Sequence, residues 1–202
     1  MDDAYLTIKK PSTGIYRDKG SRFLAFAYPV SGEEEIKEIL ESLRKEYHDA
    51  RHHCYAWRLG QDKILFRAND DGEPASSAGK PILGQIQSFD LTNVLIVVVR
   101  YFGGILLGVG GLIQAYRTAA REAILSGEII TAYVHRHLRV HFNYDDMNHI
   151  MKTVKDHDLE TREHHFESTC SLLIIVRQSM AENISARLSE AKSCRIEDEG
   201  IR

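Results

Sequence analysis

The sequence is poor in cysteine and has no long apolar run, and each absence excludes a class of protein. Its three cysteines (Cys54, Cys170 and Cys194) are odd in number and far apart, which argues against a disulfide framework and a zinc site. No wholly apolar run is longer than that from Val94 to Val99, whereas a membrane-spanning helix needs about 20 residues, so we expect no membrane segment. The first ten residues carry two aspartates and no apolar core, so we expect no secretory signal and a cytoplasmic protein.

The sequence also lacks an excess of positive charge. Its 26 lysines and arginines are outnumbered by 29 aspartates and glutamates, which gives a net charge of −3 when histidine is neutral. A generally basic surface that would attract nucleic acid is therefore excluded, and any nucleic-acid site must be a local patch. The 202 residues, of which 43% are hydrophobic, can form one large domain or two small ones.

The most distinctive stretch runs from Asp70 to Arg121. Near its middle, the apolar and mostly β-branched residues from Val94 to Val99 predict a central strand that is apolar on both faces. Five of the nine residues from Gly103 to Gly111, here called the glycine segment, are glycine. We expect this segment to form a loop between the strand and a helix that Gly127 ends.

The elements expected on either side of this stretch divide the chain into two parts. Before residue 134 we expect strands at 5–10, 22–28, 52–59 and 63–68, a helix at 32–48 and another that begins between 77 and 81. After it we expect strands at 137–142, 159–166, 169–177 and 194–197, a helix around 147–154 and a helix that a Ser179-x-x-Glu182 capping box starts. The second set has β-α-β-β-α-β order, which predicts a ferredoxin-like fold. We therefore predict an α+β protein with domains at 1–134 and 135–202.

Four distinctive sequence motifs follow one another along the chain. They are Asp18-Lys19-Gly20-Ser21-Arg22-Phe23, Asp49-Ala50-Arg51-His52-His53-Cys54-Tyr55-Ala56, Asp70-Asp71-Gly72-Glu73-Pro74 with Ala78-Gly79-Lys80-Pro81, and Arg100-Tyr101-Phe102-Gly103-Gly104 with Leu107-Gly108-Val109-Gly110-Gly111-Leu112. Together they resemble the signature of the IMPACT family, and more narrowly of its bacterial YigZ-type members. The resemblance implies an N-terminal domain like domain 2 of ribosomal protein S5 and domain IV of elongation factor G, followed by a small ferredoxin-like domain. It also implies a link to translation, because eukaryotic IMPACT regulates translation by binding proteins.

The expected fold leaves one face of the first sheet unexplained. In a fold like domain 2 of S5, helices cover one face of the sheet, yet the strand from Val94 to Val99 is apolar on both sides. We therefore expect the second face to be covered by the C-terminal domain or a partner, or to be an exposed patch with a purpose.

An acidic loop, from Asp70 to Ser77, is the first candidate site. Its motif residues are Asp70, Asp71, Gly72, Glu73, Pro74, Ser76 and Ser77. The three carboxylates have the chemistry of a metal or acid/base cluster. Asp-Gly before Glu-Pro is more simply explained as a turn.

The second candidate site combines the glycine segment with nearby cations. Its members are Lys80, Arg100, Gly103, Gly104, Gly108, Gly110, Gly111, Arg117 and Arg121. Helix N-termini bind anions through free N–H groups, so one alternative is an anion or RNA phosphate site, and the other is a tight turn with close backbone packing. Arg100 either pairs with Asp70 or Asp71 or faces a phosphate. Some relatives place a lysine where this chain has the apolar residues Ile105 to Leu107, which weakens the case for phosphate binding there.

Histidine and cysteine form no metal pattern. His52, His53 and Cys54 are adjacent on a predicted strand, so they point to opposite faces and cannot bind one ion together. As a nucleophile, Cys54 would need a base that the sequence does not identify. We predict no catalytic residue, no metal and no cofactor.

The leading prediction is a non-enzymatic cytoplasmic protein that binds RNA, the ribosome or translation factors through the glycine segment and the cations of the second site. A first alternative is an enzyme, or a protein that binds a small ligand or phosphate, with the acidic loop and the glycine segment as one pocket. A second alternative is a protein-interaction module whose apolar sheet face docks a partner. The sequence predicts no oligomeric state.

Overall fold

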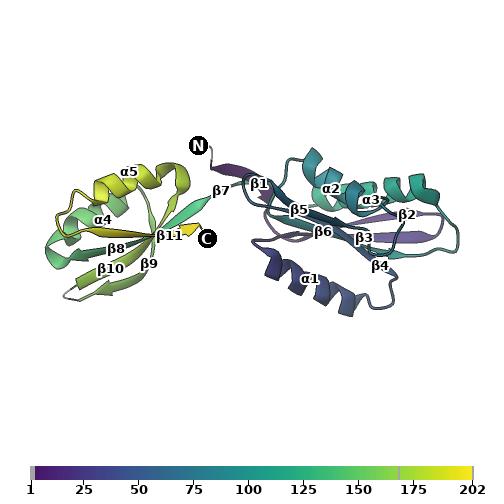
Figure 1. Cartoon of the computed structure of the whole chain (residues 1–202), viewed down its shortest axis with the longest axis horizontal. Helices are drawn as coiled ribbons and strands as arrows, with labels where there is room; N and C mark the ends of the chain where they lie inside the picture. Colours follow the sequence, from purple (N-terminus) through teal and green to yellow (C-terminus); the bar gives the residue numbers. More distant parts are fainter. Residues whose placement is uncertain (1–2, 168, 202) are drawn as a thin grey trace. The chain divides into compact units, whose positions relative to one another are not determined.

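The computed structural model describes residues 3–167 and 169–201. The chain forms two compact units, whose helices and strands are labelled in Figure 1. The N-terminal unit comprises Tyr5–Ala132, and the C-terminal unit comprises the residues from Tyr133 onward together with the segment that ends at Ala4. That these parts fold independently stays a prediction. No helix in the described part of the chain is long and apolar enough to cross a membrane.

A five-stranded sheet forms the centre of the N-terminal unit. Its strands lie in the order β2 (Ser12–Asp18), β3 (Ser21–Pro29), β6 (Val94–Tyr101), β4 (His52–Leu59) and β5 (Leu65–Asn69). All neighbouring strands are antiparallel. β6 is the middle strand, as its apolar sequence predicts, and its residues from Val94 to Arg100 are buried.

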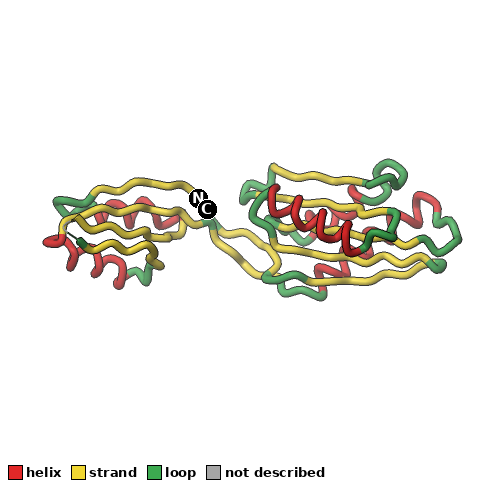
Figure 2. Tube along the Cα trace, turned by 90° about the horizontal axis from the view of Figure 1, so that it is seen from below, coloured by secondary structure: helices red, strands yellow, loops and turns green. Residues whose placement is uncertain are grey.

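Helices cover both faces of this sheet. On one face α2 (Gly79–Ser88) and α3 (Gly108–Leu125) form a core with Val94, Ile96 and Val98 of β6. On the other face α1 (Glu33–Glu46) forms a second core with Leu95 and Val97. In Figure 1 α1 lies below the sheet and the other two helices lie above it, and in Figure 2, seen from below, α1 crosses in front of the strands.

The expectation that the second face is covered by another domain or a partner, or is exposed, is therefore wrong. Ile36, Leu40 and Leu43 are the buried residues of α1 and belong to the core that contains Leu95 and Val97. The helix was predicted from its own periodicity, but its sequence does not say which face of the sheet it covers.

β2 is a strand that we did not predict from the sequence. It forms a hairpin with β3 through Lys19 and Gly20, whose positive φ angles of 44° and 78° fit a tight two-residue turn. Its residues alternate between half-buried and exposed, so it has no continuous apolar pattern. Gly14 allows β2 to pack against α3, because a Cβ there would lie 2.3 Å from the backbone nitrogen of Ala123.

The glycine segment is not all loop. α3 begins at Gly108, so Gly108, Gly110 and Gly111 belong to its first turn, and only Phe102 to Leu107 connect it to β6. The expectation that the whole segment forms a loop is therefore wrong. Glycine lowers helix propensity, and this masked the start of the helix in the sequence.

Two more strands form a separate small sheet. β1 (Ala4–Ile8) pairs with β7 (Ile129–Tyr133). The chain passes from one unit to the other at the ends of these strands, after Ala4 and after Ala132.

The C-terminal unit has the predicted ferredoxin-like order. Its sheet runs β11 (Arg195–Ile201), β8 (His135–Asn143), β10 (Thr169–Arg177) and β9 (Glu160–Phe166). A short 3₁₀ helix (Tyr144–Asp146) leads into α4 (Met147–Asp156), and α5 (Gln178–Leu188) precedes β11. Residues of both helices share one core with Val140 and Leu172 of the sheet. The α+β fold class with a ferredoxin-like second unit is confirmed.

The start of α5 differs from the predicted capping box. The Ser179 N–H donates to Oδ2 of Asp3 at 3.0 Å, so a carboxylate from the other end of the chain takes the place of the expected local cap. Arg177 Nη2 also donates to Oδ1 of Asp3, at 2.6 Å. The hydrogen bond from Arg177 holds the pKa of the buried Asp3 carboxyl well below its usual range. A partner so distant along the chain cannot be found by local pattern.

We expect Asp3→Asn to lower the free energy of unfolding at pH 7 by about 1–2 kcal/mol, a modest value because Arg177 is partly exposed. A lowered pKa stabilises the fold fully above the pKa of an unfolded aspartate, about 4, and that stabilisation is lost as the pH falls below it. The difference between wild type and variant should therefore shrink between pH 7 and pH 2.5 in urea unfolding followed by circular dichroism. The exposed Asp145→Asn is the control, and an equal effect of both substitutions would contradict the role of Asp3.

Candidate functional site

Asp70 caps the first turn of α2. Its Oδ1 accepts the N–H groups of Ala78 and Gly79 at 3.0 and 2.8 Å, and its Oδ2 accepts that of Ser76 at 2.8 Å. Partial burial alone would raise the pKa of this carboxyl, but the three backbone hydrogen bonds outweigh it and lower the pKa. Asp70 therefore serves the fold, because it satisfies N–H groups that the helix itself cannot.

Asp71 ties the acidic loop to β4 and α1. Its Oδ2 accepts the N–H of His53 at 2.7 Å, and its Oδ1 accepts a hydrogen bond of 3.3 Å from Arg44 of α1. Asp71 and Gly72 have positive φ angles of 42° and 87°, the conformation in which Asp-Gly is favoured. The Asp-Gly motif of the acidic loop therefore forms a turn.

Glu73 and Arg100 form a buried ion pair between the acidic loop and β6. Arg100 Nη1 donates to Oε1 of Glu73 at 2.6 Å, and the two residues are only 6% and 8% exposed. The same oxygen accepts the hydroxyl of Tyr116 of α3 at 2.8 Å. The guanidinium carbon of Arg100 also lies 5.4 Å from the centre of the Phe23 ring. Arg100 therefore pairs with Glu73, and the expected partners Asp70 and Asp71 are wrong.

Cys54 belongs to the same buried network. Its thiol lies 3.0 Å from the carbonyl oxygen of Asp70, to which it donates, and 3.3 Å from the hydroxyl oxygen of Tyr116. Burial raises the pKa of the Cys54 thiol and of the Tyr116 hydroxyl far above their usual values. A thiol held in its protonated form is a poor nucleophile, so Cys54 is a structural residue.

Every carboxylate of the acidic loop thus takes part in the fold. Asp70, Asp71 and Glu73 each accept hydrogen bonds from within the protein. Among residues 3–167 and 169–201, no group of three or more histidine, cysteine, aspartate or glutamate side chains is placed to hold a metal ion. This weakens the alternative in which the acidic loop and the glycine segment form one ligand pocket, because the carboxylates of that pocket are bonded within the fold.

The first glycines of the glycine segment allow two loops to touch. A Cβ on Gly103 would lie 2.0 Å from the carbonyl carbon of Gly20, so only glycine fits at this crossing. The Gly103 N–H donates to Oγ of Ser21 at 3.1 Å. Gly104 has a φ of 88°, which other residues rarely adopt. Close packing therefore explains why residue 103 is glycine, and backbone conformation explains why residue 104 is glycine.

The connection between β6 and α3 exposes apolar side chains. Ile105 and Leu106 of this connection are exposed, Leu106 to 82%, and so is Val109 in the first turn of α3. Exposed aliphatic residues that lie together are a feature of surfaces that bind another molecule.

A groove between α2 and α3 brings two of the predicted cations together. It has a volume of about 560 Å³ and is lined by Ser76, Lys80, Pro81, Gly84, Gln85, Ile113 and Arg117. Lys80 and Arg117 are exposed, and within the described part of the chain neither forms an ion pair. None of the lining residues is a carboxylate. The α2–α3 groove therefore carries two positive charges, although the chain as a whole is acidic and Lys80 also helps to lower the pKa of the nearby Asp70 carboxyl.

The predicted cations and acidic-loop residues separate into two sets. Lys80 and Arg117 line the groove, and Arg121 follows one turn after Arg117 on α3, exposed and 3.8 Å from Glu122. Arg100 and the carboxylates of the acidic loop are bonded within the fold, whereas Ser76 of that loop lines the groove. Gly84 and Gln85 line the groove but were missed, although their spacing of four residues from Lys80 and Pro81 on one helix could have indicated a shared face.

Comparison with known proteins agrees with the fold and the motifs. The profile of the Impact N-terminal domain family matches residues 19–124, which include both motif loops and the groove. The IMPACT family member YigZ of Escherichia coli (strain K12) is 43% identical over 124 residues, which are 60% of this chain and 61% of that protein. An IMPACT family member of Haemophilus influenzae is 31% identical over 180 residues, 88% of this chain and 87% of that protein.

A solved structure extends the similarity to the whole chain. It is described as the crystal structure of a hypothetical protein, is 30% identical, and matches 97% of both chains with a TM-score of 0.75. The fold and motifs define a two-unit α+β protein with an Impact N-terminal domain. The chain belongs to the IMPACT family, and it is similar to the bacterial YigZ-type members, as the motifs predicted.

We expect Arg100→Met or Glu73→Gln to lower the free energy of unfolding by about 3–5 kcal/mol, because each leaves one charge buried without its partner. The double variant Glu73→Gln/Arg100→Met removes both charges, so its cost should be clearly smaller than the sum of the single costs. Urea unfolding of the four proteins measures this coupling, and Arg17→Met on the exposed side of β2 is the control. Additive costs would show that the two residues do not act as a pair.

Alanine substitutions in the glycine segment test which of its glycines the fold requires. Gly103→Ala should destabilise the chain by more than about 2 kcal/mol, because its Cβ would overlap the backbone at Gly20. Gly110→Ala should leave stability unchanged or raise it by up to about 1 kcal/mol, because Gly110 is helical and its Cβ would meet open space. Thermal unfolding compares the two, and equal melting temperatures for both variants would rule out this division of roles.

Proposed function

We propose that this chain is a non-enzymatic cytoplasmic protein that binds the translation machinery by contacting RNA phosphates with its α2–α3 groove. Lys80 and Arg117 supply the charge, and Arg121 extends it along α3. The observation that carries the proposal is that two exposed, unpaired cations from two helices meet in one groove that no carboxylate lines, within the described residues.

The chemistry of the groove suits a phosphate chain. Lysine and arginine bind phosphate oxygens, and Ser76 and Gln85 beside them can donate hydrogen bonds to sugar and phosphate. Gly84 adds a second argument, because a Cβ there would meet nothing within 4 Å. A glycine inside a helix costs about 1 kcal/mol relative to alanine, and no internal packing offsets this cost. Close approach of a phosphate backbone to α2 would explain why no side chain stands there.

The family resemblance also supports binding to the translation machinery. It implies a connection with translation, through eukaryotic IMPACT, and N-terminal folds shared with a ribosomal protein and an elongation factor. An enzymatic role has less support, because the carboxylates and the thiol near the motifs are all engaged inside the protein.

A specific observation favours a second candidate, a docking site for a protein partner. Leu106, with Ile105 and Val109 beside it, is exposed on the connection between β6 and α3. The resemblance to a family whose eukaryotic members bind proteins gives this candidate its weight. The apolar sheet face that we first expected to serve this purpose is covered by α1.

The test compares binding of variants to purified ribosomes by co-sedimentation at several salt concentrations. Lys80→Ala/Arg117→Ala should fold normally, bind at least tenfold more weakly at low salt, and lower the slope of log affinity against log salt by about two contacts. The matched control Lys37→Ala/Lys45→Ala removes the same charge from α1, on the other face of the sheet, and should bind almost as wild type does.

Unchanged binding of Lys80→Ala/Arg117→Ala would overturn the proposal. A loss of binding that is independent of salt and follows Ile105→Ser/Leu106→Ser instead would favour the protein-docking candidate.

A further inference from the structure

The C-terminal unit has one open sheet face. Along β8, Leu138, Val140 and Phe142 point into the core that α4 and α5 share. Side chains alternate along a strand, so His137 and His141 lie on the opposite face. Figure 1 shows both helices on the same side of this sheet. The open face is therefore available for binding, and its residues are largely polar.

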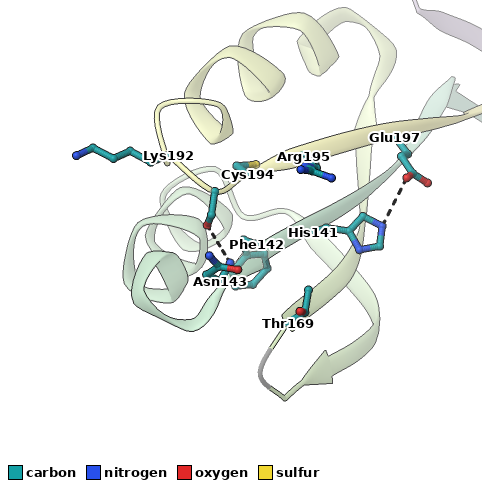
Figure 3. A pocket seen from close by; sticks show the side chains of 9 residues that line it. His141, Phe142, Asn143, Thr169, Lys192, Cys194, Arg195 and Glu197 are labelled. Carbon is teal, nitrogen blue, oxygen red and sulfur yellow. Dashed lines mark hydrogen bonds and ion pairs between the residues drawn. The ribbon is translucent and has the colours of Figure 1, made fainter.

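One end of this open face is hollowed. A pocket of about 760 Å³ is lined by His141, Phe142, Asn143, Thr169, Lys192, Ser193, Cys194, Arg195 and Glu197. Arg195 of β11 stands opposite His141 of β8, and Thr169 of β10 stands opposite Asn143. Figure 3 shows these side chains around the hollow, with Lys192 extending outward from the connection between α5 and β11.

The positive charges of this pocket are not balanced by ion pairs within the described part of the protein. Of its two permanent cations, neither Lys192 nor Arg195 forms an ion pair with another described residue. Glu197 is the one carboxylate of the lining, and it lies 3.9 Å from the imidazole of His141 rather than at either cation. The neighbouring carboxylate of Asp146 accepts the N–H of Ser193 at 3.0 Å, and hydrogen bonds from Ser193, with help from Lys192, lower the pKa of this carboxyl. Lys192 does this without forming an ion pair with Asp146, so Arg195 is the cation with less internal compensation.

We infer that this pocket binds the phosphate of a nucleotide, with Arg195 as the main phosphate ligand. An arginine guanidinium matches two phosphate oxygens at once, and the Thr169 hydroxyl and the Asn143 amide can supply further donors from the neighbouring strands. Lys192 at the rim adds attraction for the anion.

The size of the hollow indicates a ligand larger than phosphate itself. Pockets for small organic ligands have volumes of about 300–1,000 Å³, and this pocket of about 760 Å³ lies within that range. The flat ring of His141 beside Arg195 is a surface on which a base can stack. A nucleoside monophosphate, free or at the 5′ end of an RNA strand, fits these features. This site does not rest on the proposed function of the α2–α3 groove.

Isothermal titration calorimetry on the full chain tests the inference with adenosine 5′-monophosphate, inorganic phosphate and adenosine as probes. The monophosphate should bind, and adenosine, which lacks the phosphate, should bind at least tenfold more weakly. Arg195→Ala should weaken binding of the monophosphate at least tenfold, and Thr169→Val about threefold. Arg187→Ala, on α5 and therefore on the helical face of the unit, should leave it unchanged.

Two results would overturn the inference: no heat from the monophosphate or phosphate at millimolar concentration, or equal affinity of wild type and Arg195→Ala. Thermal unfolding of each variant shows whether a loss of binding reflects a loss of folding, and Arg195→Lys, which keeps the charge, should retain part of the affinity.

A short RNA with a 5′-phosphate shows whether the ligand is a free nucleotide or the 5′ end of an RNA strand. Displacement of the monophosphate by this RNA, but not by the same RNA without the phosphate, indicates a strand end, and no displacement indicates a free nucleotide.

Discussion

The buried ion pair between Glu73 and Arg100 is the interaction on which the N-terminal unit depends. Burying two charges costs several kcal/mol, and this cost is offset only when both charges are paired and further hydrogen bonds are made. Tyr116 supplies one such hydrogen bond, and Cys54 connects Tyr116 to the backbone of Asp70. The network therefore joins the acidic loop, β4, β6 and α3 in one place.

This network also sets the geometry of the surface above it. The acidic loop leads directly into α2, whose first turn Asp70 caps, and Tyr116 holds α3 one residue before Arg117. Lys80 and Arg117 meet in the α2–α3 groove because the buried groups fix where both helices lie. A small set of internal polar contacts thus positions an external pair of charges.

Most of the fold follows from local patterns in the sequence. The apolar residues from Val94 to Val99 predict the central strand, and alternation with helical periodicity predicts the ferredoxin-like order of the second unit. What local pattern cannot supply is the partner of an element. β2 has a polar sequence and is a strand because β3 pairs with it, and α5 is capped by Asp3, from the other end of the chain.

The candidate site was only partly predictable for the same reason. Unusual residues such as Asp70, Glu73, Arg100 and Gly103 mark the motifs, and most of them turn out to hold the fold together. Lys80 and Arg117 were both named as site residues, but they are 37 positions apart, and the groove that they share comes from the packing of α2 against α3. Sequence patterns identify strained or buried positions more readily than the exposed side chains that meet a partner.

Chemical footprinting of Lys80 tests the central claim most directly. Acetylation of exposed lysines, read by mass spectrometry, compares the free chain with the chain bound to ribosomes. Because Lys80 lies in the groove and Lys45 lies on α1 across the sheet, binding should protect Lys80 and leave the reactivity of Lys45 unchanged. Equal acetylation of Lys80 in the free and the bound chain would contradict the claim that the α2–α3 groove is the contact surface.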